Sequence, residues 1–196
     1  MKIFPAYAAN FELYPKDGEA SQHLTPLLDN IKKVDFVLSV SDPNVNQGQM
    51  TSTFDAELEK RILDFGASSI DFKLPPTIPQ ELDFAFSYGG YKVAVEIEKA
   101  NREKILRDFL KCHMYLLSGA NFTLVVLPKN YPHKHGVWNL FEFGVQRYKE
   151  CLAYGFGTPG SLGRILLLGF EQVCGTTNET LSSKNRDRIR KEALEQ

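Results

Sequence analysis

Two strand-like runs on either side of a glycine pair constrain the fold of this 196-residue chain more than any other feature. Residues 82–88 and 91–98 are rich in aromatic and aliphatic side chains, and they flank Gly89-Gly90. Glycine adopts the positive φ angles that a two-residue hairpin turn requires, so this arrangement predicts an antiparallel β-hairpin. We therefore expect a hairpin near the middle of the chain.

Carboxylates gather at this hairpin. Side chains alternate between the two faces of a strand, so Glu96 and Glu98 share a face, about 7 Å apart along the strand. Asp83 belongs to the partner strand, across the turn. Three converging carboxylates repel one another unless a positive group lies among them, and a hard divalent cation is the natural candidate. The alternative is that both glutamates face solvent on an edge strand. The other face of this strand is apolar and consists of Val93, Val95 and Ile97.

The rest of the chain predicts strands and helices in mixed order. Apolar runs and helical periodicity predict strands at 2–9, 34–40, 122–127 and 165–170, and helices at 19–33, 54–65, 102–117 and 138–153. The polar stretch 42–53 contains proline, asparagine and glycine and predicts a loop. We expect an α/β fold with a central mixed β-sheet flanked by helices. The length fits a single domain, assigned to residues 1–177, and 178–196 form a polar, charged tail or helix.

Charge is distributed unevenly along the chain although its formal net value is only −1. Residues 1–98 contain 8 Lys and Arg against 15 Asp and Glu, whereas residues 99–196 contain 15 against 9. Such asymmetry indicates either a polyanionic partner of the basic half or two halves whose charges offset each other in the fold.

Cysteine content and hydropathy indicate the compartment. Three widely spaced cysteines without a CxxC motif argue against a disulfide framework and a zinc knuckle. No apolar run approaches the ~18 residues of a membrane span, and the first residues lack the apolar stretch of a signal peptide. We expect a cytoplasmic protein that does not bind membranes.

The residues at the hairpin resemble a known catalytic motif. Asp83, then Glu96-Ile97-Glu98 after a hairpin, then a helix, is similar to the PD-(D/E)xK nuclease core. The more specific resemblance is to the branch of type II restriction endonucleases that includes BamHI, BglII and BstYI. It extends over most of residues 1–170, through Met1-Lys2-Ile3, Tyr7, Gln47-Gly48-Gln49, the strand Lys92–Glu98, Asp108, His113-Met114, the run Val125–Pro128 and the run Ile165–Gly169.

This resemblance implies a restriction-endonuclease-like core, a Mg²⁺ cofactor and roles for individual residues. Asp83 and Glu96 would be Mg²⁺ ligands, and Glu98 the general base or water-orienting residue. Glu98 replaces the usual final lysine of the superfamily, as in BamHI. Lys99 follows it but falls on the opposite strand face, so it does not take the place of that lysine.

The branch also draws a fourth polar residue from a helix before the hairpin. Asp55 matches that position best, with Glu57 and Glu59 as alternatives. Asp55 is also explained as an acidic residue near a helix N-terminus, where it interacts favourably with the helix dipole.

DNA binding would then belong to the basic half of the chain, where Lys99, Arg102, Lys104, Arg107 and Lys111 lie on or just before one helix. Such residues contact phosphates, whereas loop residues read base edges. A solvated basic helix face is the alternative. The resemblance further implies a prokaryotic homodimer that cuts double-stranded DNA at a palindrome with a GATC core. The residues predicted to contact DNA are Lys99, Asn101, Arg102, Lys104, Lys129 and Lys134.

Two other functions remain open at this point. One is a nuclease of the same core that acts in repair or phage defence without palindrome specificity. The other is a catalytically inactive DNA-binding protein with a degenerate site.

Overall fold

The computed structural model describes residues 3–31, 34–39, 47–75, 81–98, 101–133, 136–155 and 159–174, together with 178–180, 182, 184–185 and 188. Its strands are β1 (Ile3–Tyr14), β2 (Val34–Ser39), β3 (Ser68–Ser69), β4 (Phe84–Tyr88), β5 (Tyr91–Ile97), β6 (Phe122–Pro128), β7 (Tyr131–His133), β8 (Gly136–Trp138) and β9 (Ile165–Cys174). Its helices are α1 (Glu19–Leu28), α2 (Gln47–Asp64), α3 (Lys104–Leu117), α4 (Leu140–Ala153) and α5 (Pro159–Leu162).

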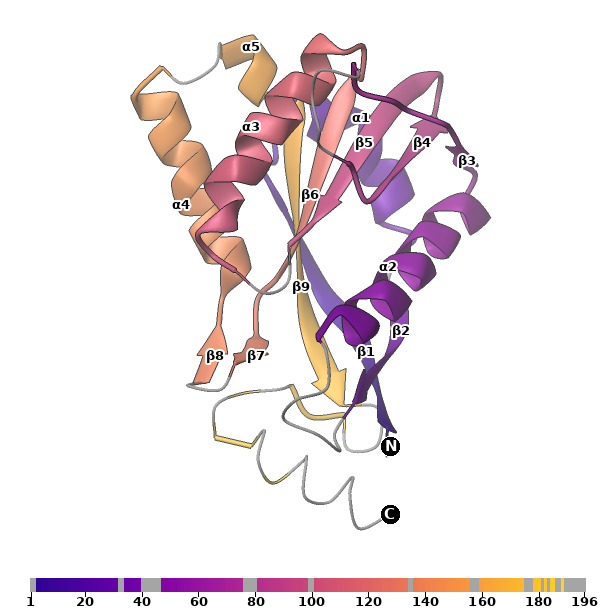
Figure 1. Cartoon of the computed structure of the whole chain (residues 1–196), viewed down its shortest axis with the longest axis vertical. Coiled ribbons are helices and arrows are strands. Elements are labelled where there is room, and N and C mark those ends of the chain that lie inside the picture. The colour runs from indigo at the N-terminus through magenta and orange to yellow at the C-terminus, as the bar shows by residue number, and fades with distance from the viewer. Residues whose placement is uncertain are drawn as a thin grey trace.

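A mixed β-sheet forms the middle layer of the molecule (Figure 1). Within the described residues it has seven strands in the order β2-β1-β9-β6-β5-β4-β3. The three central strands β5, β6 and β9 run parallel to one another, and β1 and β4 pair with them antiparallel. The fold is therefore a mixed α/β domain, as the sequence predicts.

Helices cover both faces of the sheet because its central strands are apolar on both sides. α1 and α2 pack on one face, where Leu24, Leu58 and Val95 belong to one core cluster. α3, α4 and α5 pack on the other face, where Phe109, Phe141 and Leu167 belong to a second cluster. Both faces of the sheet are therefore covered by helices. A polar side chain that lies between a strand and a helix on either face is buried.

The predicted hairpin is confirmed. β4 and β5 pair antiparallel in a register that brings Tyr88 opposite Tyr91. Gly89 and Gly90 form the turn at φ angles of 58° and 85°, a region that other residues adopt only with strain. β5 then continues through α3 into β6, which lies beside it in parallel.

Several predicted boundaries differ from the structure. α2 begins at Gln47, so the predicted loop at 42–53 is wrong for residues 47–53, including the Gln47-Gly48-Gln49 stretch. Glutamine and methionine favour a helix, and the single glycine in the first turn does not prevent one. β1 and β9 extend beyond the predicted 2–9 and 165–170, because they pair with each other over most of their length. Residues 42–46 lie outside the described part of the chain.

The predicted tail is described only in part. Thr180 forms an isolated antiparallel bridge with Val173 of β9, and Arg188 forms an ion pair with Glu179. Among the described residues, every helix is too short or too polar to cross a lipid bilayer.

Candidate active site

The end of β5 places two carboxylates beneath α3. Glu96 lies opposite Val125 of β6 and points to the sheet face that α3 covers, whereas Val93 and Val95 point to the opposite core. Glu96 is 5% exposed and Glu98 is 8% exposed. β5 has β4 on one side and β6 on the other, so the alternative of two solvent-facing glutamates on an edge strand is wrong.

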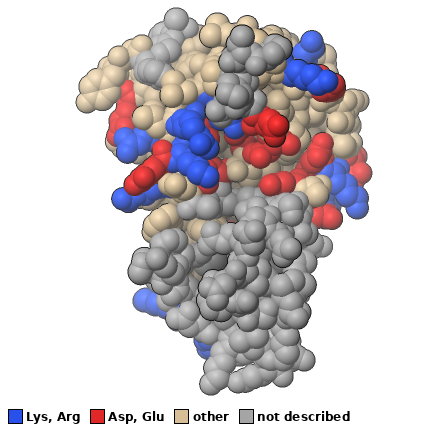
Figure 2. Space-filling view, viewed as in Figure 1, with Lys and Arg blue, Asp and Glu red and all other residues tan. Residues whose placement is uncertain are grey.

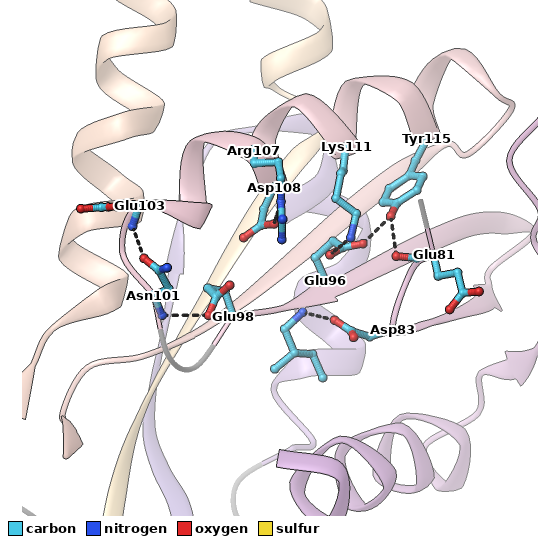
Figure 3. A network of polar contacts seen from close by, with 11 residues as sticks. Glu81, Asp83, Glu96, Glu98, Asn101, Glu103, Arg107, Asp108, Lys111 and Tyr115 are labelled. Atoms are coloured by element: carbon cyan, nitrogen blue, oxygen red, sulfur yellow. Dashed lines mark hydrogen bonds and ion pairs between the residues drawn. The ribbon is translucent and has the colours of Figure 1, made fainter. Parts of the chain in front are cut away.

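Both carboxylate oxygens of Glu96 accept bonds from α3 (Figure 3). The Lys111 ammonium lies 2.5 Å from Oε2, and the Tyr115 hydroxyl donates to Oε1. The side chains of Lys111 and Glu96 are only 8% and 7% exposed. A buried ion pair is tolerated where hydrogen bonds satisfy the remaining lone pairs, and Tyr115 supplies one here. Burial raises the pKa of Glu96, while the bonds from Lys111 and Tyr115 oppose that rise.

Glu98 is oriented by the turn that leads into α3. Its Oε1 accepts a hydrogen bond of 3.0 Å from the backbone N–H of Asn101, whose own Oδ1 accepts one of 2.8 Å from the N–H of Glu103. The backbone N–H of Glu98 donates to Val126 of β6. These bonds fix Glu98 at the point where the sheet ends and the helix is about to begin.

Asp83 lies directly before β4, next to the end of β5. Its side chain is exposed, and its Oδ2 accepts a 2.6 Å hydrogen bond from the backbone N–H of Ile97, between the two glutamates. It contributes to the raised pKa of Glu96, so its negative charge acts on that carboxylate. The structure therefore places Asp83 against the backbone of Ile97, between Glu96 and Glu98, and a shared role of the three carboxylates stays a prediction.

Asp108 of α3 adds another carboxylate on the same side of the sheet. It is 3% exposed, and its Oδ2 has no hydrogen-bond partner among the described residues. The Arg107 guanidinium lies 4.0 Å from its other oxygen. Burial, followed by the negative charges of Glu98 and Glu96, raises the pKa of Asp108 from 3.8 to about 7. Glu96, Glu98 and Asp108 are thus three buried carboxyl groups held between β5 and α3.

The chemistry of these side chains fits a hard divalent cation, but their arrangement is not that of a formed metal centre. Carboxylate oxygens are the ligands that Mg²⁺ prefers, and buried carboxylates repel one another in the absence of a cation. However, the described residues contain no group of three His, Cys, Asp or Glu side chains close enough to hold one ion. The Lys111 ammonium occupies the position next to Glu96 instead.

Asp55, predicted as the fourth residue of the site, belongs to α2 and not to the β5–α3 region that holds the other carboxylates. It is half-buried on α2, which packs with the core on the face opposite to α3. Glu57 and Glu59 are on the same helix and are also half-buried. A role for Asp55 in the site stays a prediction.

The residues predicted to contact DNA have different environments. Arg102 and Lys104 are exposed at the start of α3, and the Arg102 guanidinium lies 5.2 Å from the centre of the Phe143 ring. The Lys129 ammonium pairs with Glu12 at 2.9 Å and lies 3.9 Å from Glu171. Asn101 orders the turn before α3. Lys99 and Lys134 lie outside the described residues.

Asp108, Lys111 and Tyr115 are the members of the site that the sequence analysis did not assign to it. The sequence pattern places Lys111 among basic helix residues that either contact DNA or face solvent, and neither holds for Lys111 because its side chain is buried against Glu96. Asp108, Lys111 and Tyr115 are spaced three and four residues apart, which places them on one face of a helix. That polar stripe, within an otherwise apolar helix face, is the pattern from which their position could have been predicted.

No family model matches the chain, and no curated protein matches it either. The similarity to restriction endonucleases therefore rests on the residues named above.

Proposed function

We propose that this protein is a Mg²⁺-dependent type II restriction endonuclease that hydrolyses double-stranded DNA at a palindromic site. The observation that carries the proposal is the burial of Glu96, Glu98 and Asp108 between β5 and α3, next to Asp83. Burying an ionised carboxylate is costly unless it is paired with a positive group. In this group the Lys111 ammonium is paired with Glu96. Such an arrangement is more characteristic of a catalytic site than of a core built for stability.

The order of elements also supports the proposal. An antiparallel hairpin, β4–β5, carries Asp83 and the two glutamates, and it leads through α3 into a parallel strand, β6. The sequence motif Asp83…Glu96-Ile97-Glu98 resembles the PD-(D/E)xK nucleases in the same order. Its resemblance to the BamHI, BglII and BstYI branch implies a homodimer in which each subunit cuts one strand.

Each residue has a role that its position permits. Asp83 and Glu96 would hold Mg²⁺, which, when bound, supplies charge neutralisation at the phosphate and lowers the pKa of a bound water. Glu98 accepts the proton of the attacking water, or orients it. The hydrogen bond from Asn101 to its Oε1 directs that carboxylate without neutralising it. Lys111 and Tyr115 fix the orientation of Glu96.

Two features support DNA contact near this site. Arg102 and Lys104 are exposed at the start of α3, close in the chain to Glu98. The N-terminus of a helix also carries a partial positive charge that favours phosphate. Arginine and lysine there would position the duplex, while other residues read its sequence.

One observation favours a second candidate function, a catalytically inactive DNA-binding protein. The Lys111 ammonium already neutralises Glu96, which a nuclease needs as a metal ligand. In an inactive protein this ion pair would be permanent, and the acidic cluster would have a structural role only.

Plasmid cleavage tests the proposal against this alternative. We would incubate supercoiled plasmid with Mg²⁺ and either the wild-type protein, Glu96→Gln or Glu142→Gln. Glu142 is exposed on α4 and serves as a matched control for loss of one carboxylate. Circular dichroism and thermal unfolding confirm that each variant is folded.

The proposal predicts discrete fragments from the wild type and from Glu142→Gln. The cleavage rate of Glu96→Gln should be lower by at least about 100-fold, which is the usual effect of losing a principal catalytic interaction. A smear of fragments would indicate a nuclease without site specificity. The absence of cleavage by the folded wild type on DNA that contains all GATC-core palindromes, or equal cleavage by Glu96→Gln, would contradict the proposed activity.

A further inference from the structure

We propose that the Lys111 ammonium is an exchangeable internal counter-ion, which neutralises Glu96 in the cation-free protein and moves to Asp108 when a divalent cation binds at Glu96. This inference rests on the proposed function, because it concerns how the same site accepts its metal. It also explains why the described carboxylates are not arranged as a formed metal centre.

The first step of the argument is the position of Lys111. Its ammonium lies 2.5 Å from Glu96 Oε2, and Tyr115 donates to the other oxygen, so both oxygens already have a partner. Two positive charges on one buried carboxylate repel strongly, because the screening by water is weak there. This repulsion favours departure of the ammonium from Glu96 when that carboxylate accepts a cation.

The second step is the presence of another acceptor. Asp108 lies three residues before Lys111 on α3, which places both side chains on the same helix face. The side chain of Asp108 is 4% exposed, and its Oδ2 has no hydrogen-bond partner among the described residues. Figure 3 shows Asp108 on the underside of α3, between Glu98 and Lys111.

A buried carboxylate oxygen without a partner is unfavourable, and folded proteins rarely keep one without a reason. An ammonium that moves to it would gain the bond that the oxygen lacks.

The third step is that the move requires only a change of side-chain conformation. Lysine carries its charge on a flexible four-carbon stem, and residues three apart on a helix are neighbours. The ammonium would be paired with a carboxylate both before and after the move. A displaced ammonium without Asp108 would be buried and unpaired, at a cost that would oppose cation binding. Asp108 is thus a positioning residue in this proposal, and Lys111 is the group that it positions.

Calorimetric titration of the DNA-free protein with Mg²⁺ tests this inference without reference to activity. The variants are Lys111→Met, Asp108→Asn, the double variant and Glu96→Gln. Lys111→Gln replaces Lys111→Met if the methionine variant does not fold, and circular dichroism verifies all of them. Removal of the competing ammonium should tighten Mg²⁺ binding about fivefold or more, the usual lower bound for coupling between two binding events.

Asp108→Asn should weaken Mg²⁺ binding by a similar factor in the wild-type background. It should change binding less than about twofold in Lys111→Met, where no ammonium needs an acceptor; double-mutant cycles measure such coupling. Equal weakening in both backgrounds would show that Asp108 acts on the cation directly and would overturn the inference.

The remaining outcomes separate this inference from the proposed function. If the wild type binds Mg²⁺, Glu96→Gln does not, and Lys111→Met binds no more tightly than the wild type, then the exchange is wrong and the metal site stands. If neither the wild type nor folded Lys111→Met or Lys111→Gln binds Mg²⁺, then the metal site itself is wrong, and the exchange is wrong with it.

Discussion

At the scale of single residues, Glu96 is the centre of the polar network. Lys111 and Tyr115 bond to its two oxygens from one helix, and Asp83 acts on it from the neighbouring strand. Buried polar networks are specific because every member needs a partner, and a substitution in one of them affects the others. Burial, followed by the negative charges of Glu98 and Glu96, also raises the pKa of the nearby Asp108 carboxyl group.

The raised pKa of Asp108 predicts how stability depends on pH. Its pKa rises from 3.8 in an unperturbed side chain to about 7 in the folded protein, mainly through burial. The folded protein therefore keeps a proton that the unfolded chain has released, and stability falls as the pH rises from about 4 to about 7. Asp108→Asn removes this contribution, which is on the order of 1 kcal/mol per pH unit in that interval.

Urea unfolding of both proteins in the presence of EDTA, between pH 5 and pH 8, measures the difference. The stability advantage of the wild type over Asp108→Asn should decrease as the pH rises, and then level off above pH 7. Two parallel stability curves would show that Asp108 ionises normally in the folded protein.

At the scale of elements, α4 lies close to the central sheet because two glycines leave room for side chains. A Cβ added at Gly144 would lie 2.4 Å from Leu127 Cδ1, and one added at Gly169 of β9 would lie 2.6 Å from two ring atoms of Phe141. Both distances are shorter than van der Waals contact. This packing fixes the second core cluster, to which α3 also contributes Phe109.

We therefore predict that Gly169→Ala destabilises the protein by about 1–3 kcal/mol, the usual cost of overpacking a core. Phe141→Leu in the same chain removes the aromatic ring and should recover part of that loss, so that the two substitutions are not additive. Urea denaturation of the single and double variants measures this. Additive losses would show that the ring is not what the added methyl group meets.

The sequence predicts an element well where the residues that determine its structure are close together in the chain. The β4–β5 hairpin depends on Gly89 and Gly90 and on alternation within a few residues, so the sequence predicted both the hairpin and the face that carries Glu96. The first turns of α2 were missed because glycine and polar residues at 47–53 are also typical of loops.

The partner of Glu96 could not be predicted in the same way. Lys111 is fifteen residues from Glu96 in the chain, and the pair forms because α3 crosses back over β5. In sequence alone Lys111 resembles the exposed lysines and arginines around it. Its burial follows from the packing of a helix on a sheet, which local patterns do not determine.

At the scale of the whole molecule, part of the charge asymmetry is offset inside the fold. Lys111 and Lys129, from the basic half, pair with Glu96 and Glu12 from the acidic half. Basic and acidic side chains also lie beside one another in a band across the face seen in Figure 2. The DNA surface of the proposed function is therefore a local one, and Arg102 and Lys104 are exposed basic residues that suit it.

We predict that these two residues account for part of the salt dependence of DNA binding. The logarithm of the affinity decreases linearly with the logarithm of salt concentration, with a slope near −0.9 for each phosphate contact. Alanine at both Arg102 and Lys104 should make this negative slope shallower by about two. Alanine at exposed Lys73, which pairs with Asp71 after β3, serves as the control. Fluorescence anisotropy in EDTA measures the slopes, and an unchanged slope in the double variant would exclude this surface.

The positions of the cut ends test the central claim most directly. Genomic DNA digested with the wild-type protein and Mg²⁺ would be sequenced at all fragment ends, with Glu96→Gln as the reference digest. If this protein is a type II restriction endonuclease, the ends fall at one palindromic sequence with a constant offset on the two strands, and the Glu96→Gln digest lacks them. Ends scattered without a common sequence, or the same ends in both digests, would contradict the claim.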